Sequence, residues 1–219
     1  MPRLLFKKTG PAVWISHLDL MRLFQRAFKR AGLSLTHSGG FTPRPQVSIA
    51  LPLSVGVASQ CELLDFDLDG EMPPADVIRN KLNDALVSGV EVLDIYAQGR
   101  KIRDLSLLEC RITLEYDGGV PATARDEIDA LFARDSLFVE KRGKNGPVNQ
   151  DIISMIHQIA ITQENANELT LRALICCQNP TLNPAQLCTA IENELPQYRP
   201  DFAKIERLEI FDASKTIFR

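Results

Sequence analysis

The sequence predicts an α+β protein made of two tandem ferredoxin-like units, each with the order strand, helix, strand, strand, helix, strand (βαββαβ) and an antiparallel sheet. Two observations support this prediction. Segments with apolar residues at every second position are interspersed with segments whose apolar residues recur at helical spacing, and the same order occurs twice in the 219-residue chain. The junction is expected at residues 98–101, which gives an N-terminal domain of residues 1–98 and a C-terminal domain of residues 99–219.

The first helix has the clearest expected boundaries. Ser16 is suited to cap the N–H groups of its first turn, with Asp19 three residues later as a short-armed capping box. Gly32 supplies the left-handed conformation that commonly ends a helix. Apolar residues at helical spacing between these ends predict a buried stripe, made of Leu20, Met21, Phe24, Phe28 and Ala31.

The rest of the first half reads as strands and loops around a second helix. Pro73 and Pro74 open that helix, which is expected to continue to about Leu86. Apolar and acidic residues alternate over residues 62–68, which is typical of a half-buried strand. The other expected strands are residues 3–8, 46–51 and 90–96, with a loop over 38–45 and a turn over 52–60.

The second half repeats this order of elements without repeating the sequence. Strict alternation predicts a strand over residues 108–116, and Asn183-Pro184 opens a helix because proline is tolerated in the first turn. The other expected elements are a helix over 122–133 and strands over 137–141, 169–176 and 205–211. Residues 142–150, which include Asn145-Gly146, are expected to form a polar loop, and residues 152–159 a short inserted helix.

Composition favours a cytoplasmic globular protein, with 45% hydrophobic and 24% charged residues. The longest apolar run is shorter than the ~18 residues of a membrane span, and the N-terminus reads as a native start rather than a signal peptide. The cysteines are odd in number and lack C-x-x-C spacing, so we expect buried free thiols, with no metal and no cofactor. They are Cys61, Cys110, Cys176, Cys177 and Cys188. Without a closely spaced cysteine triplet, the chain is not expected to be a radical S-adenosylmethionine (SAM) enzyme.

Charge is distributed unevenly along the chain. Residues 1–50 contain eight Lys or Arg and one acidic residue, a net charge of +7, whereas residues 51–219 contain 17 basic and 27 acidic residues, a net charge of −10. Such an asymmetry suggests a face for a polyanion or an acidic partner. On the first helix, basic residues at helical spacing form either a stripe that follows a phosphate backbone or an ordinary solvated face. These residues are Arg22, Arg26, Lys29 and Arg30, and Lys7, Lys8 and Arg44 add charge in the same segment.

The Gly-Pro-rich loop of residues 38–45 is a second candidate for ligand binding. Its two glycines expose backbone N–H groups, Phe41 offers a stacking face, and Arg44 offers a planar cation. The alternative is a rigid turn with Phe41 packed in the core. Trp14 has the same two interpretations, as a core residue or as part of an RNA-stacking platform with Phe41.

Histidines and aspartates provide weaker candidates. His17 and His37 could serve acid–base chemistry in RNA cleavage or bind a metal, but they flank a helix about 20 Å long, so no joint site is expected. We favour His17 as a structural or recognition residue. Asp65, Asp67 and Asp69 alternate on one side of a strand, as a solvated face or a metal site. The expected nucleic-acid or partner-binding residues are Lys7, Lys8, His17, Arg22, Arg26, Arg30, His37, Phe41 and Arg44, and no catalytic residue is expected.

Several motifs resemble the radical SAM-linked protein family, a bacterial domain. They are Lys8-Thr9-Gly10, Ile15 to Arg22, Phe24 to Ala27, Arg30 to Leu33, Ser38 to Pro45, Ala50 to Val57, and Glu62. Further along the chain, Ile153 stands where the family pattern has an arginine. The resemblance implies a stand-alone domain that works with a radical SAM protein carrying a cobalamin-binding region, and an association with ribosome and RNA metabolism.

Three hypotheses follow. The chain is a non-catalytic accessory module that binds structured RNA, such as tRNA or rRNA, and works with a radical SAM partner. Alternatively, the basic face docks an acidic surface of that partner and RNA has no part. A third alternative is a metal-independent ribonuclease or RNA-modifying enzyme that uses His17 or His37, although the sequence shows no nucleophile–base set and no phosphate-binding P-loop.

Overall fold

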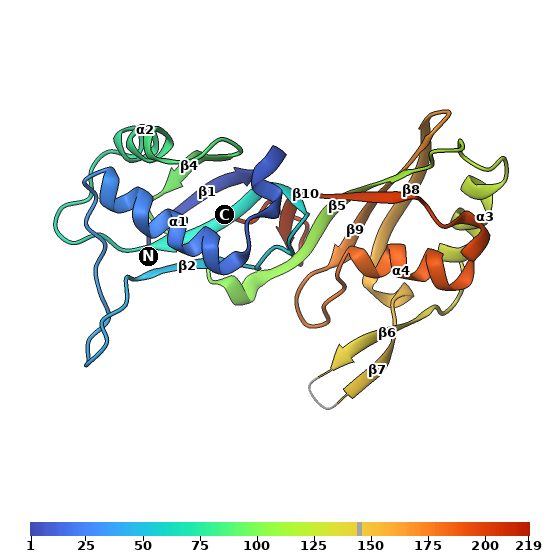
Figure 1. Ribbon diagram of the computed structural model, residues 1–219. Helices are drawn as coiled ribbons and strands as arrows, with labels where there is room; N and C mark the ends of the chain where they lie inside the picture. The colour runs from blue at the N-terminus through green and yellow to red at the C-terminus, as the bar shows by residue number, and fades with distance from the viewer. Residues whose placement is uncertain (144–145) are drawn as a thin grey trace. The chain divides into compact units, whose positions relative to one another are not determined.

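The computed structural model describes residues 1–143 and 146–219 and is a mixed α+β fold with mostly antiparallel strands (Figure 1). Within these residues the chain has four α-helices. It divides into two compact units, which are unit 1, residues 1–104 with 217–219, and unit 2, residues 105–216. None of the described helices is both long and apolar enough to cross a membrane.

Unit 1 is a sheet with two helices packed on one face. Its elements are β1 (Arg3–Lys8), a 3-10 turn η1 (Gly10–Trp14), α1 (His17–Arg30), β2 (Val47–Ala50), β3 (Ala58–Phe66), α2 (Ala75–Ala85) and β4 (Val90–Tyr96). The strands lie in the order β4-β1-β3-β2, and every neighbouring pair is antiparallel. β3 begins at residue 58, so the end of the expected turn over 52–60 is strand instead.

The core of unit 1 depends on the apolar stripe of α1. Phe24 meets Phe6 of β1 edge to face at 4.8 Å between ring centroids, and Phe28 meets Phe66 of β3 at 5.2 Å. Such aromatic pairs add to the burial of their own large apolar surfaces. The predicted stripe is confirmed, because Leu20, Phe24 and Phe28 are buried and its other members pack against the same core.

The predicted ends of α1 are also confirmed. The Ser16 hydroxyl accepts the Asp19 backbone N–H at 3.2 Å and donates to the Asp19 carboxylate at 2.7 Å. At the other end, Gly32 has a φ of +68°, and the N–H groups of Gly32 and Leu33 bond to the carbonyls of Lys29 and Phe28. This is the paired hydrogen bonding of a Schellman turn, which satisfies two otherwise free helix carbonyls.

After this turn the chain forms a projecting hairpin, residues 36–46, which we call the arm. Figure 1 shows it leaving the body of unit 1 as a narrow blue loop between α1 and β2. Backbone bonds from Gln46 to Thr36 and from Ser38 to Arg44 hold its two sides together, and the Thr36 hydroxyl donates to the Asp67 carboxylate at 3.0 Å. The expected loop therefore has defined pairing at its base.

The last three residues of unit 1 come from the far end of the chain. Phe218 is fully buried, and the guanidinium groups of Arg3 and Arg100 lie 5.5 and 5.0 Å from its ring centroid. Arg3 also makes a bidentate pair with Asp65, at 2.6 and 2.9 Å. A Cβ at Gly99 would come within 2.5 Å of the Arg3 guanidinium, so this glycine at the expected junction is required by close packing.

The strands of unit 2 lie in the order β10-β5-β9-β8, and every neighbouring pair is antiparallel. Its elements are β5 (Leu105–Glu115), α3 (Ala124–Phe132), β6 (Phe138–Gly143), β7 (Gly146–Asp151), β8 (Ile156–Asn165), β9 (Glu168–Cys176), α4 (Ala185–Glu194) and β10 (Phe202–Asp212). β6 and β7 pair only with each other among the described residues and form a separate hairpin.

Two expectations for unit 2 are wrong. Most of the expected polar loop over 142–150 is the β6–β7 hairpin, although Asn145 lies outside the described residues. The expected helix over 152–159 is only a 3-10 turn, Ile153–Met155, followed by β8. The isoleucines at 152, 153, 156 and 159 recur at helical spacing, which is why a helix was expected. In the structure, a bulge between residues 156 and 158 interrupts the two-residue alternation of strand β8.

Replacing Gly32 with alanine should lower the free energy of unfolding by about 1–2 kcal/mol, because a Cβ disfavours the left-handed conformation. Gly39→Ala is the matched control, since Gly39 lies outside that conformation and has room for a Cβ. Its expected effect is within about 0.5 kcal/mol. Urea denaturation of both variants checks this, and equal losses of stability would contradict the role given to Gly32.

Candidate nucleic-acid interface

The outer face of α1 carries the basic residues that the sequence indicated, all of them exposed. They differ in what they contact. Arg22 pairs with Asp19 at 3.0 Å, and both side chains are more than half exposed, so the pair is weak and leaves Arg22 accessible. Hydrogen bonds from Ser16 and Arg22 lower the pKa of Asp19.

Arg30 has a structural contact, because its guanidinium donates to the carbonyl of Ala85 at the end of α2. Arg26 and Lys29 lie between Arg22 and Arg30 on the helix and make no ion pair with any other described residue. Arg26 and Lys29 are therefore the cations of α1 that are most available to a ligand.

The arm presents two further predicted residues. Phe41 at its tip is fully exposed, so the alternative in which this ring packs into the core is wrong. Arg44 is exposed, and its backbone N–H donates to the Ser38 hydroxyl at 3.1 Å. The arm thus holds an aromatic ring and a guanidinium away from the core of unit 1.

Lys7 and Lys8 do not join this face. Lys7 pairs with Glu91 of β4 at 2.7 Å, and it points to the sheet face opposite Phe6, because side chains alternate along a strand. Lys8 is 1% exposed, and its ammonium donates to the carbonyls of Val13 and Ile15 at 3.1 and 2.9 Å. Burial lowers the pKa of Lys8, while the Glu62 carboxylate acts to raise it.

The two predicted histidines lie near opposite ends of α1. His17 is the first residue of the helix and is half-buried. His37 is exposed at the base of the arm, where it forms a bridge with Pro45. They therefore form no joint acid–base site.

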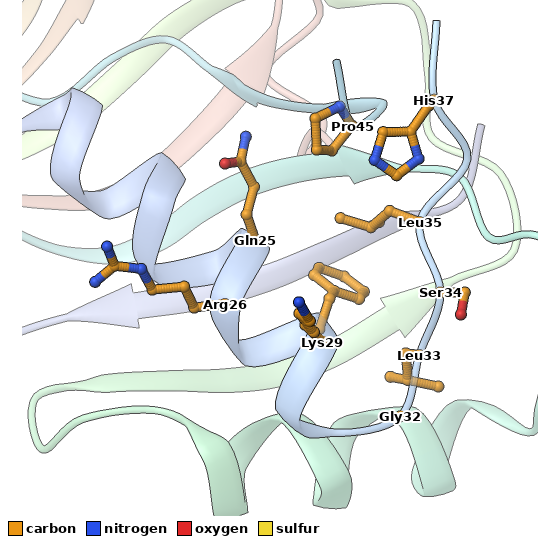
Figure 2. Close-up of a pocket in the computed structure, with 10 residues that line it drawn as sticks. Gln25, Arg26, Lys29, Gly32, Leu33, Ser34, Leu35, His37 and Pro45 are labelled. Carbon is orange, nitrogen blue, oxygen red and sulfur yellow. The ribbon is translucent and has the colours of Figure 1, made fainter. Parts of the chain in front are cut away.

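A cavity of about 490 Å³ lies where the second half of α1 meets the base of the arm. It is lined by Gln25, Arg26, Phe28, Lys29, Gly32, Leu33, Ser34, Leu35, His37 and Pro45. Figure 2 shows Gln25 and Lys29 projecting from α1, with Leu35, His37 and Pro45 across from them, while Arg26 extends away from the other side chains. Sequence reasoning missed most of these residues, and the one available signal was the helix-ending Gly32.

The aspartates of β3 and its continuation do not form a metal site. Asp65 is paired with Arg3, and Asp67 accepts from Thr36. No group of three His, Cys, Asp or Glu residues suited to a metal occurs in the described part of the chain. Trp14 is more than half exposed, so its interpretation as a core residue is wrong, and its ring lies beside Gly56.

All five cysteines are free and buried, as expected. Burial raises the pKa of Cys110, Cys177 and Cys188 to about 12 in each case. Cys176 also has a raised pKa from burial, and its sulfur lies 3.4 Å from the His157 imidazole. Because the thiolate is the reactive form, these thiols are poor nucleophiles near neutral pH.

Fold and site together define a mixed α+β protein with a cationic helix face beside a projecting arm. The chain belongs to the family DUF2344, described as an uncharacterized protein conserved in bacteria, whose model matches residues 2–184. Comparison with curated proteins finds no match.

Solved structures show low similarity, each at 11% sequence identity. An H/ACA RNP bound to a substrate RNA containing 2'-deoxyuridine has a TM-score of 0.48 and covers 94% of this chain and 46% of its own. A Cbf5-Nop10-Gar1 complex has a TM-score of 0.49, with coverage of 95% and 48%. The chain spans about half the length of these two. An unknown protein from Galdieria sulphuraria has a TM-score of 0.26, with coverage of 94% and 96%. These similarities are too low to support an inference about binding.

In the native protein, iodoacetamide at pH 8 should modify Cys110, Cys177 and Cys188 at least about a hundredfold more slowly than in the guanidinium-unfolded chain, whose thiols have pKa values near 8.5. The native rate should keep rising with pH up to 10, because the folded-state pKa of about 12 keeps the thiolate fraction far from its maximum. Peptide mass spectrometry measures each site. Rapid native modification at pH 8 would contradict the assigned burial.

Proposed function

We propose that this protein is a non-catalytic module that binds structured RNA through unit 1. The carrying observation is that Arg26 and Lys29, neither of them ion-paired within the described residues, line a cavity at the junction of α1 and the arm. The same arm presents a fully exposed Phe41 and an exposed Arg44. Cations that follow phosphates supply affinity, and an exposed aromatic ring supplies a surface for an unpaired base.

The distribution of charge supports unit 1 as the RNA-binding part. Unit 1 has a net charge of +3 and unit 2 of −6, counted over the full sequence. Basic residues on the sheet of unit 2 are paired with acidic ones, namely Arg111 with Glu206, Arg172 with Glu109, and Lys204 with Glu115. The polyanion is therefore attracted to unit 1 and not to unit 2.

We further propose that each unit is a ferredoxin-like domain, with the boundary within residues 98–105. The order β4-β1-β3-β2 and the order β10-β5-β9-β8 support this. With β6 and β7 left out of the numbering, each unit places its fourth, first, third and second strands side by side, with a helix after the first and third of these strands. The β6–β7 hairpin is then an insertion after the first helix of unit 2.

A radical SAM protein is the partner that we propose for the RNA-bound module. The second candidate function is docking to that protein without RNA, and one observation favours a protein contact. Trp14, Leu18 and Val55 are large apolar side chains that are each more than half exposed, and they lie at or near the start of α1, away from the arm. Exposed apolar side chains of this kind favour protein interfaces over phosphate binding.

Replacing both Arg26 and Lys29 with glutamine should weaken RNA binding and reduce the slope of log affinity against log salt by about 1 for each phosphate that no longer meets a cation. Fluorescence anisotropy with a labelled RNA hairpin over a series of salt concentrations measures the slope. Lys81→Gln on the exposed side of α2 is the control, because it removes a charge from the same unit and should leave the slope unchanged. No wild-type affinity at low salt, or affinity without salt dependence, would contradict RNA binding.

Phe41→Ala should weaken RNA binding about tenfold, because stacking of a base on an aromatic side chain contributes ~1–3 kcal/mol. It should leave the melting temperature unchanged, since the ring is fully exposed. Trp14→Ala replaces the exposed aromatic residue near the other end of α1 and should leave RNA affinity unchanged while reducing capture of a purified radical SAM partner. An RNA affinity that is unchanged in Phe41→Ala would contradict a role of the arm in the proposed interface.

A further inference from the structure

The cavity at the base of the arm has an apolar floor. Phe28, Leu33 and Leu35 are buried, and the Schellman turn at Gly32 brings the two leucines back against the helix that carries Phe28. Its volume of about 490 Å³ lies within the ~300–1,000 Å³ range typical of small-molecule sites. A flat ring therefore has both room and an apolar surface to cover.

The mouth of the cavity has polar groups that are available to a ligand. The side chains of Gln25, Lys29 and His37 line it and are not engaged by hydrogen bonds to other described residues. An amide both donates and accepts, a neutral imidazole does the same, and an ammonium only donates. This set matches the edge of a nucleobase together with an adjacent phosphate.

Resting on the proposed RNA-binding function, we propose that the cavity holds one unpaired nucleotide of the bound RNA. The base lies over Leu33 and Leu35, beneath which Phe28 is already buried, its edge bonds to Gln25 and His37, and its phosphate meets Lys29. Arg26, a lining residue whose side chain extends away from the others in Figure 2, contacts the phosphate of a neighbouring nucleotide.

This proposal explains why a cavity coincides with the basic face. A paired base is stacked within a duplex and its edge is engaged, so a fully paired stem would contact the cations and leave the cavity empty. Sequence-specific RNA recognition is directed mainly at unpaired bases in loops and bulges for this reason. The cavity therefore adds selectivity for an unpaired nucleotide to an otherwise general attraction for phosphates.

The test compares two RNA hairpins that differ only by a single-nucleotide bulge in the stem. The full-length protein should bind the bulged hairpin at least about tenfold more tightly, and 2-aminopurine at the bulge should change its fluorescence on binding. Gln25→Ala and His37→Ala should reduce this preference towards equal binding, and both positions are accessible enough for the fold to tolerate alanine. Arg22→Gln, outside the cavity on the same helix, should weaken both hairpins equally and keep the preference.

The outcomes separate this inference from the function on which it rests. Equal, salt-dependent binding of both hairpins overturns the nucleotide cavity and leaves RNA binding intact. Absence of binding to either hairpin overturns both proposals. Saturable binding of AMP, GMP, CMP or UMP at the His37 ring, measured by NMR, without RNA binding would assign the cavity to a free nucleotide and overturn the RNA source.

Discussion

The site depends on one backbone constraint, the left-handed turn at Gly32. The N–H groups of this turn bond to two carbonyls at the end of α1, and the chain then runs back beside the helix. Leu33 and Leu35 then meet Phe28, and the arm begins at Thr36, anchored through Asp67. Cationic helix face, cavity and arm therefore share one origin, because a continued helix would have carried the following residues away from Arg26 and Lys29.

Tertiary contacts divide the basic residues of the first fifty positions into different roles. Lys7 is paired with Glu91, Arg30 bonds to Ala85, and Lys8 is enclosed by backbone carbonyls. Each of these contacts engages a cation in stabilising the fold. The net charge of the segment overstates the charge that a ligand meets, and the remainder is concentrated on α1 and the arm.

Local signals predicted the features that local chemistry determines. The Ser16 cap, the Gly32 turn and the apolar stripe of α1 each depend on residues within one or two helical turns, and all are confirmed. The burial of Lys8 and the cavity residues Gln25 and Leu35 depend on neighbours brought together by the fold, and no spacing pattern indicates them. The β8 strand was not predicted for a different reason. A bulge interrupts its two-residue alternation, so that its isoleucines recur at helical spacing.

The return of Ile217–Arg219 to unit 1 has a consequence for biosynthesis. Arg3 precedes unit 2 in the chain, yet Phe218, which its guanidinium covers, is made only after all of unit 2. Unit 1 therefore cannot complete its packing until unit 2 has been translated. Completion of unit 1, which carries the surface that we propose for RNA, therefore follows the synthesis of unit 2.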